Sequence, residues 1–193
     1  MTNFTIHTKQ TAPAASQPLI DAVISKYGLL PNLLAELAEA PNVLKAYLQL
    51  SGSIDEGTLD ATERQIVQIT ASRINGCHYC VAAHSTISDI NKLPDDVIEA
   101  VRNDTPIANA KQEALRQFAK VVVRKQGWAN DAEIQKFVAA GYSKAQILEV
   151  VLSVSLKVIS NYANHIMDTP VDQAFQKRAI DLGDHHKKTA CCG

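Results

Sequence analysis

The sequence predicts an all-α protein, and three of its features support that prediction. Apolar residues recur at three- and four-residue intervals along almost the whole chain, which is the period of an amphipathic helix. The strict alternation of apolar and polar residues that marks a half-buried strand is not sustained anywhere. Capping and helix-ending residues separate the periodic segments from one another.

The first helices are delimited by glycine and proline. The apolar residues that begin at Leu19 recur at helical spacing until Gly28 stops the run. Pro31 and Pro41 then each open a further helix, because proline is favoured in the first helical turn. The third of these helices is expected to end in the turn at Gly57.

The next two helices frame the segment of greatest interest. A helix over residues 58–75 is predicted, with Asp60 as its N-cap and Glu63 three residues later as the partner of a capping box. Its end is expected at Asn75 and Gly76, which favour a left-handed stop. A following helix is expected to start at or beside Cys77 and to run to about residue 90.

The C-terminal half is expected to contain the longest helix. Pro94 opens a short helix, and Asp131 and Ser143 are the expected N-caps of two later ones. The segment that Ser143 caps is apolar nearly all the way round, as expected of a central buried helix. The remaining ranges expected to be helical are 111–126, 144–167 and 171–182.

The composition is that of one ordinary globular domain. The chain has 193 residues, a hydrophobic content of 46% and a formal net charge of −1. Residues 1–16 are expected to form an N-terminal arm, residues 17–182 the domain with its core motif at 59–90, and residues 183–193 a flexible polar tail. The charge balance and the lack of a long apolar run predict no nucleic-acid or membrane partner and a cytoplasmic protein.

The four cysteines fall into two close pairs, Cys77 with Cys80 and Cys191 with Cys192. A structural disulfide framework normally scatters its cysteines through a small secreted chain. Two close pairs therefore indicate redox chemistry or metal binding.

The segment from Cys77 to His84 has the arrangement of a dithiol redox site. In a helix, Cys77, Cys80 and His84 occupy positions i, i+3 and i+7 and lie in one narrow stripe. The stripe begins at a helix N-terminus, which favours a thiolate and lowers a cysteine pKa from about 8.5. Cys80 is predicted to attack a peroxide, His84 to take up its proton or hold a water, and Cys77, at the exposed helix start, to resolve the sulfenic acid to a disulfide.

Three other interpretations of the pair are weaker. Zinc uses the same spacing, but its further ligands would have to be His84 and His165, and the chain has no second C-x-x-C. A thioredoxin fold would require a strand before the motif. Two incidental buried cysteines would not explain a histidine on the same stripe. In the tail, His185, His186, Cys191 and Cys192 are taken as adventitious metal ligands.

Residues 59–84, LDATERQIVQITASRINGCHYCVAAH, resemble the signature of the AhpD-like, carboxymuconolactone decarboxylase family. The flanking segments YGLLPNLLAELAEAPNVLKAYLQL and NYANHIMDTPVD are similar to those of its peroxidase-related members. The resemblance implies an all-helical fold that assembles as a homotrimer or homohexamer. It implies a hydroperoxide substrate, catalytic roles for Cys80, Cys77 and His84, and a dithiol or lipoyl-type protein as reductant, with no metal or other cofactor.

Two positions depart from the family pattern. Gln65 stands where the family has a relay glutamate, and glutamine can orient a water or His84 but cannot act as a base. Tyr79 stands before the second cysteine, where a histidine is expected, and His78 lies one place earlier. Two competing functions therefore stay open: a decarboxylase-like activity on a small lactone acid, and a non-catalytic redox-responsive protein.

Overall fold

The computed structural model describes residues 4–183, so the Cys191–Cys192 pair and the tail histidines lie outside the described residues. In that part of the chain every regular element is helical, and the predicted all-α fold is confirmed. The elements are η1 (Ala14–Ser16), α1 (Gln17–Tyr27), α2 (Asn32–Leu37), α3 (Pro41–Asp55), α4 (Ala61–Ile74), α5 (His78–Ile90), α6 (Asp95–Arg102), α7 (Ala110–Arg124), α8 (Asp131–Ala139), α9 (Lys144–Met167) and η2 (Gln173–Arg178).

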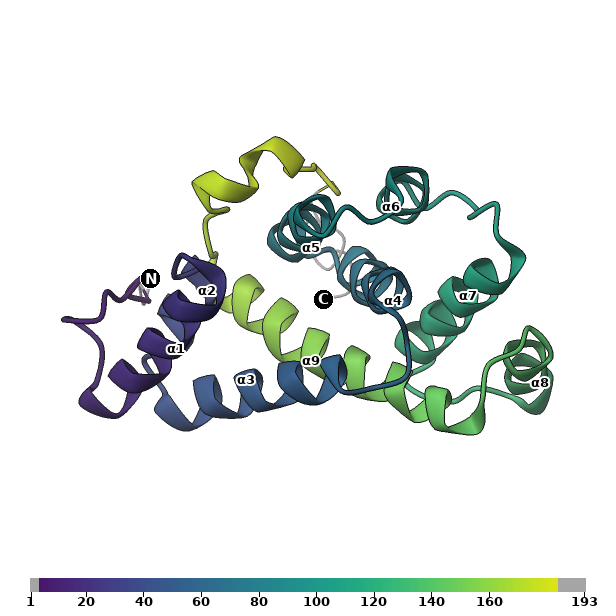
Figure 1. Ribbon diagram of the computed structural model, residues 1–193, viewed down its shortest axis with the longest axis horizontal. Helices are drawn as coiled ribbons and strands as arrows, with labels where there is room; N and C mark the ends of the chain where they lie inside the picture. The colour runs from purple at the N-terminus through teal and green to yellow at the C-terminus, as the bar shows by residue number, and fades with distance from the viewer. Residues whose placement is uncertain (1–3, 184–193) are drawn as a thin grey trace, which may run out of the picture.

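The long helix α9 connects the two ends of the molecule (Figure 1). Helices α1, α2 and α3 gather at one end, and α7 and α8 lie at the other. Helix α4 occupies the middle, where it packs against α5, α6, α7 and α9, while η2 returns to pack on α5. The segment between α4 and α5 therefore lies where both halves of the molecule meet.

Two apolar clusters form the interior, and α5 contributes to both. The C-terminal core is built around α4 and α7 and includes stacked rings of Phe118, Phe137 and Tyr142, with centroids 4.4 and 4.5 Å apart. The N-terminal core contains both thiols together with apolar residues of α1–α3 and η2: Ile20, Val23, Leu33, Leu34, Leu37, Leu44, Cys77, Tyr79, Cys80, Ala82 and Phe175. Each fully buried leucine or isoleucine contributes about 1.5–3 kcal/mol to stability.

The predicted caps of α4 and α9 are present. The Asp60 side chain accepts from the Glu63 N–H at 2.8 Å, and the Glu63 carboxylate accepts from the Asp60 N–H at 3.0 Å. Glu63 Oε1 also accepts the Tyr142 hydroxyl at 2.9 Å, so this glutamate joins α4 to the loop before α9. Ser143 caps α9 in the same reciprocal manner with Gln146.

Two sequence predictions of local structure are wrong. The N-cap of α8 is Asn130 and not Asp131, because the Asn130 side chain accepts the Glu133 N–H at 2.9 Å. The predicted helix at 171–182 is reduced to the 3-10 turn η2. Its N-cap, Asp172, directs its carboxylate to the Asn32 N–H and the Tyr79 hydroxyl, away from a capping role.

Within residues 4–183, no single helix combines the length and apolar character needed to cross a membrane. Helices α8 and α9 together have such a composition, but they meet at a bend of 109°.

Candidate active site

The thiol pair lies at the start of α5. Gly76 adopts a left-handed φ of 74°, which turns the chain sharply out of α4 and places Cys77 at the N-cap of α5. There the Cys77 sulfur accepts the Cys80 N–H at 3.4 Å. The sulfur thus takes the place of the oxygen that caps most helices and receives a backbone N–H of the first turn.

Both thiols are buried, which corrects the expectation that Cys77 is exposed. The exposed fractions are 1% for Cys77 and 2% for Cys80. The start of α5 is not a surface feature because α1–α3 and η2 cover it as part of the N-terminal core. A substrate or reductant reaches either sulfur only if neighbouring side chains move.

Asn164 of α9 bridges the two sulfurs. Its Nδ2 group donates to Cys80 Sγ at 3.2 Å and to Cys77 Sγ at 3.6 Å. Its own Oδ1 atom is buried and has no hydrogen-bond partner among the described residues. A side-chain amide that faces sulfur with its donor end stabilises negative charge on that sulfur.

The surroundings of Cys80 favour its thiolate. Burial by itself raises the pKa of this thiol. Four neighbouring groups oppose this effect of burial and lower the pKa of Cys80 to about 6. They are the hydrogen bond from Cys77, the positive charge of Lys157 and the hydrogen bonds from Ser160 and Asn161. The hydrogen bond to Cys80 and burial raise the pKa of Cys77 far above its usual range. Cys80 is therefore the thiol that ionises first.

Lys157 is the charged residue of the site, and it lies in the middle of α9 with an exposed fraction of 0%. Its Nζ is 2.6 Å from His84 Nε2. The pKa of Lys157 lies below its ordinary value, because burial outweighs the opposite effect of the nearby Cys80 and Cys77 sulfurs. A buried ammonium group favours negative charge nearby, and its electrostatic interaction with Cys80 is one of the effects that lower the pKa of that thiol.

His84 connects Lys157 to Gln65. An ammonium group can only donate, so His84 Nε2 accepts and the ring proton is on Nδ1. Nδ1 donates to Gln65 Oε1 at 2.9 Å. Burial and the charge of Lys157 both lower the pKa of His84 well below its ordinary value, so the ring is neutral. The structure thus brings the predicted site residues together, with Lys157 as an added member between His84 and the thiols.

Further hydrogen bonds between polar side chains join α9 to α4 next to these contacts. Asn161 Nδ2 donates to Ser72 Oγ at 3.3 Å, and Asn75 Nδ2 donates to Asn161 Oδ1 at 2.9 Å. These bonds tie α9 to α4 directly beneath the thiols. The sequence analysis missed Lys157 and Asn164, although a lysine inside a long apolar helix, followed at helical spacing by Ser160, Asn161 and Asn164, was a usable signal.

Tyr79, the second departure from the family pattern, forms hydrogen bonds to two other segments of the chain. Its hydroxyl donates to Asp172 Oδ2 at 2.5 Å and accepts the Leu33 N–H at 3.3 Å. The Asp172 carboxylate also accepts the Asn32 N–H at 3.1 Å. Tyr79 therefore joins α5 to the start of α2 and to the segment after α9, which cover the thiols.

The remaining histidines lie away from this arrangement. His78 is half-buried, with Nδ1 2.9 Å from the Ile180 carbonyl oxygen. His165, which a zinc site at the cysteine pair would have needed as a ligand, is exposed. No group of three metal-ligating side chains occurs among the residues that the structure describes.

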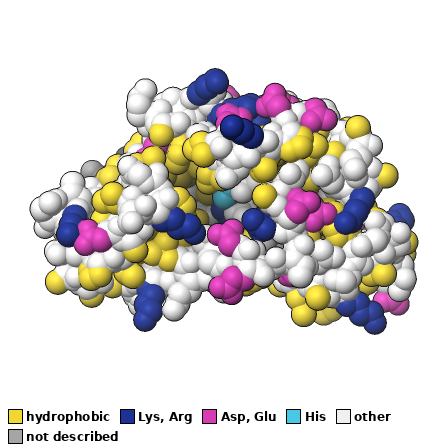
Figure 2. All heavy atoms as spheres, in the orientation of Figure 1, with side chains coloured by type: hydrophobic (Ala, Val, Ile, Leu, Met, Phe, Trp, Pro, Cys, Tyr) yellow, Lys and Arg dark blue, Asp and Glu magenta, His cyan; other side chains and the backbone are white. Residues whose placement is uncertain are grey.

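Figure 2 shows a hollow at the centre of one face, with a histidine side chain at its floor and hydrophobic side chains along its rim.

Comparisons with known proteins agree with the resemblance seen in the sequence. Residues 41–121 match the model of the carboxymuconolactone decarboxylase family. The sequence has no significant match among curated proteins.

Solved structures with the same fold include two peroxidase-related proteins. That from Ralstonia eutropha JMP134, described as an alkylhydroperoxidase AhpD core, has a TM-score of 0.79 and 22% identity over 90% of this chain and 93% of its own. That from Silicibacter sp. TM1040 has a TM-score of 0.77 and 18% identity over 90% and 92%. The debrominase Bmp8, solved as its C82A variant with 2,3,4-tribromopyrrole, has a TM-score of 0.79 and 18% identity over 92% and 96%. The fold is therefore that of AhpD-like proteins.

Proposed function

We propose that this AhpD-like chain is a thiol-dependent hydroperoxide reductase in which Cys80 attacks the peroxide, Cys77 resolves and His84 assists proton transfer. The observation that carries the proposal is the setting of the buried Cys80 thiol, where the hydrogen bond from Cys77, the charge of Lys157 and further hydrogen bonds outweigh burial and lower the pKa to about 6. A thiolate that is formed at neutral pH is the nucleophile that peroxide reduction requires.

In the first step the Cys80 thiolate attacks the terminal oxygen of the hydroperoxide. The S–O bond forms as the O–O bond breaks, which leaves Cys80 as a sulfenic acid and releases an alcohol. The alkoxide that departs needs a proton, and the Lys157 ammonium group beside the thiols is the donor in this proposal. His84 Nε2 lies 2.6 Å from that ammonium group and holds it in place. In the second step His84 assists the transfer of the proton that Cys77 releases.

In the second step Cys77 attacks the sulfur of the sulfenic acid. Its own proton leaves for the Lys157–His84 pair, a disulfide forms, and the hydroxide takes up a proton and departs as water. The N-cap position of Cys77 favours this step, since its sulfur is already 3.4 Å from the Cys80 N–H. Overall, one hydroperoxide and two thiols give an alcohol, water and a disulfide.

A dithiol must then supply two electrons by thiol–disulfide exchange. We propose a small dithiol or a lipoyl-type protein, because both sulfurs are buried and a long, narrow arm reaches them more easily than a folded protein surface. No metal or other cofactor takes part in these steps. A cytoplasmic location belongs to the same proposal, since that compartment keeps dithiols reduced.

The assembly is proposed to be a homotrimer or homohexamer. Five large apolar side chains of α9 are exposed at helical spacing and form a stripe: Leu148, Val151, Val158, Tyr162 and Ile166. Such a stripe is a usual subunit contact. Sedimentation of the wild-type chain and of Ile166→Glu tests it, with dissociation expected for the variant.

The deciding experiment is turnover of cumene hydroperoxide with dihydrolipoamide as reductant. The background is Cys191→Ser with Cys192→Ser, so that only the two site thiols react. Cys80→Ser is expected to abolish turnover, whereas Cys77→Ser is expected to stop after one sulfenic acid per chain, measured by dimedone labelling and mass spectrometry. Activity that survives Cys80→Ser would overturn the proposal.

The competing functions give different results in the same experiment. The family whose model matches is named after a decarboxylase. A decarboxylase-like enzyme would act on a small lactone acid whether or not its thiols were alkylated. A non-catalytic redox protein would form the disulfide but consume no more peroxide than free thiols do. Because the debrominase Bmp8 shares the fold, 2,3,4-tribromopyrrole serves as a comparison substrate.

A further inference from the structure

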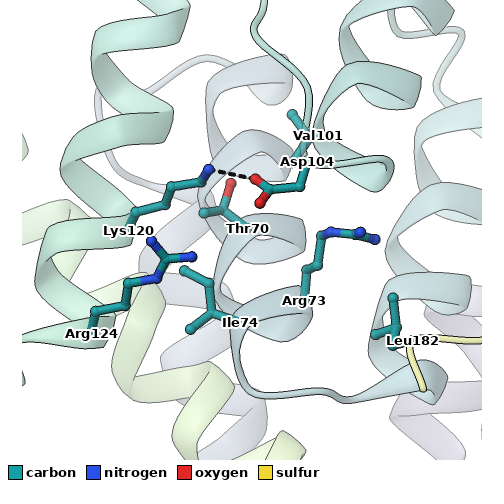
Figure 3. A pocket seen from close by; sticks show the side chains of 8 residues that line it. All are labelled: Thr70, Arg73, Ile74, Val101, Asp104, Lys120, Arg124 and Leu182. Atoms are coloured by element: carbon teal, nitrogen blue, oxygen red, sulfur yellow. Dashed lines mark ion pairs between the residues drawn. The ribbon is translucent and has the colours of Figure 1, made fainter.

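A second feature lies outside the thiol site, on the side of α4 that faces α6 and α7. It is a cavity of about 280 Å³, and no residue of the candidate active site lines it. Its walls come from α4, the end of α6, the segment before α7, α7 itself and the chain after η2 (Figure 3). The lining residues are Thr70, Arg73, Ile74, Val101, Asp104, Lys120, Arg124 and Leu182.

The charge of this lining is positive. The lining contains three cations, Arg73, Lys120 and Arg124, and a single carboxylate, that of Asp104. Lys120 forms an ion pair with Asp104, and Arg116 also donates to this carboxylate, at 2.7 Å. Asp104 is thus already shared by two cations and has little capacity left for either arginine of the cavity.

Neither arginine forms an ion pair with an acidic side chain of residues 4–183. Arg73 donates Nη1 to the Arg102 carbonyl oxygen, and this is its only hydrogen bond to another residue of the described chain. Arg124 has neither an ion pair nor a hydrogen bond within residues 4–183, and Figure 3 shows its guanidinium group directed from α7 toward α4. Arg124 is exposed and Arg73 is half-buried, and arginine forks bind the oxygens of phosphate or carboxylate in pairs, so both guanidinium groups are available to an oxyanion in the cavity.

Thr70 provides a second and independent observation. Its exposed fraction is 2%, and its Oγ1 atom has no hydrogen-bond partner among the described residues. Figure 3 shows this hydroxyl directed toward the Lys120–Asp104 ion pair, among the side chains that line the cavity. A buried hydroxyl without a partner is unfavourable in a folded protein, and a ligand oxygen in the cavity would satisfy it.

We propose that this cavity binds a small organic anion that carries a phosphate or carboxylate group. The oxyanion contacts Arg73, Arg124 and the Thr70 hydroxyl. A volume of about 280 Å³ exceeds the needs of a bare ion, and Ile74, Val101 and Leu182 offer an apolar wall for the organic part. The site does not depend on the proposed peroxidase function.

Isothermal titration of the full chain with glycerol 3-phosphate, inorganic phosphate and succinate tests the proposal. Saturable binding of at least one of the three, one per chain, is expected. The phosphate and succinate titrations decide which group is preferred, and stronger binding of glycerol 3-phosphate than of inorganic phosphate supports the apolar wall. Absence of binding for all three in low-salt buffer overturns the proposal.

Variants locate the site. Arg124→Gln is expected to weaken binding about tenfold or more, since it removes a charge-assisted contact. Thr70→Val, which keeps the shape of the side chain, is expected to weaken binding several-fold while the unfolding midpoint in urea stays the same or rises. Lys45→Gln is the control, because it removes the same charge from an exposed residue of α3. Equal loss in Arg124→Gln and Lys45→Gln, or unchanged affinity in Thr70→Val, contradicts the assignment.

Discussion

Replacing Lys157 by methionine isolates the contribution of its charge to the reactivity of Cys80. Methionine keeps most of the side-chain volume in a site whose exposed fraction is 0%, so the packing of α9 is largely preserved. What disappears is the ammonium group beside His84 Nε2 and the thiols. The expected result is a higher pKa for Cys80, because burial then acts with less opposition.

The size of the effect follows from elementary electrostatics. Two unit charges on neighbouring side chains interact by about 2–4 kcal/mol at an effective dielectric constant of about 20. That energy corresponds to roughly 2 pKa units. Adding this shift to the pKa of about 6 gives an expected pKa of about 8 for Cys80 in the Lys157→Met variant. At pH 7 the thiolate fraction then falls from about nine tenths to about one tenth.

The assay is the rate of alkylation of Cys80 by iodoacetamide as a function of pH, followed by mass spectrometry in the Cys191→Ser and Cys192→Ser background. The wild-type midpoint is expected near 6, with the rate rising as pH increases through it. Lys157→Met should raise that midpoint and lower the rate at pH 7 about tenfold. Lys144→Met is the matched control, because it makes the same substitution at an exposed residue of the same helix.

Two results would refute this reasoning. A midpoint in Lys157→Met equal to that of the control would mean that the lysine charge does not act on the thiol. A wild-type midpoint near 8.5 would mean that the donors around Cys80 do not outweigh its burial. In the second case the non-catalytic redox interpretation becomes the better one.

Three further substitutions test other contacts. Gln65→Glu places a carboxylate on His84 Nδ1 and should raise the pKa of that imidazole, which NMR titration of the ring protons measures; an unmoved titration contradicts the relay geometry. Asn164→Leu removes the amide donor from both sulfurs and should slow alkylation of Cys80 at pH 7, with circular dichroism as the control for folding. Tyr79→Phe leaves the Asp172 carboxylate without its hydroxyl donor and should lower the free energy of unfolding in urea by about 1–3 kcal/mol; a loss near zero would mean that water replaces the bond.

Local features of this chain could be predicted from its sequence because they depend on neighbouring residues. The all-α class, the Asp60–Glu63 capping box, the Ser143 cap and the helix start at Cys77 follow from hydrogen bonds that span three or four residues. The stripe of Cys77, Cys80 and His84 is equally local, since one helix carries it. For such features the sequence and elementary helix geometry are sufficient.

The tertiary structure decided everything that depends on contacts between distant segments. Lys157 and Asn164 enter the site from α9, some 80 residues after the thiols, and helical spacing within α5 contains no information about them. Cys77 is buried, not exposed, because α1–α3 and η2 cover the start of α5. The motif by itself indicated which thiols are candidates for the proposed reaction. Only the packing of α9 against α5 determined the charge that would make one of them a thiolate, because a pKa depends on every group around the sulfur and not only on those nearby in sequence.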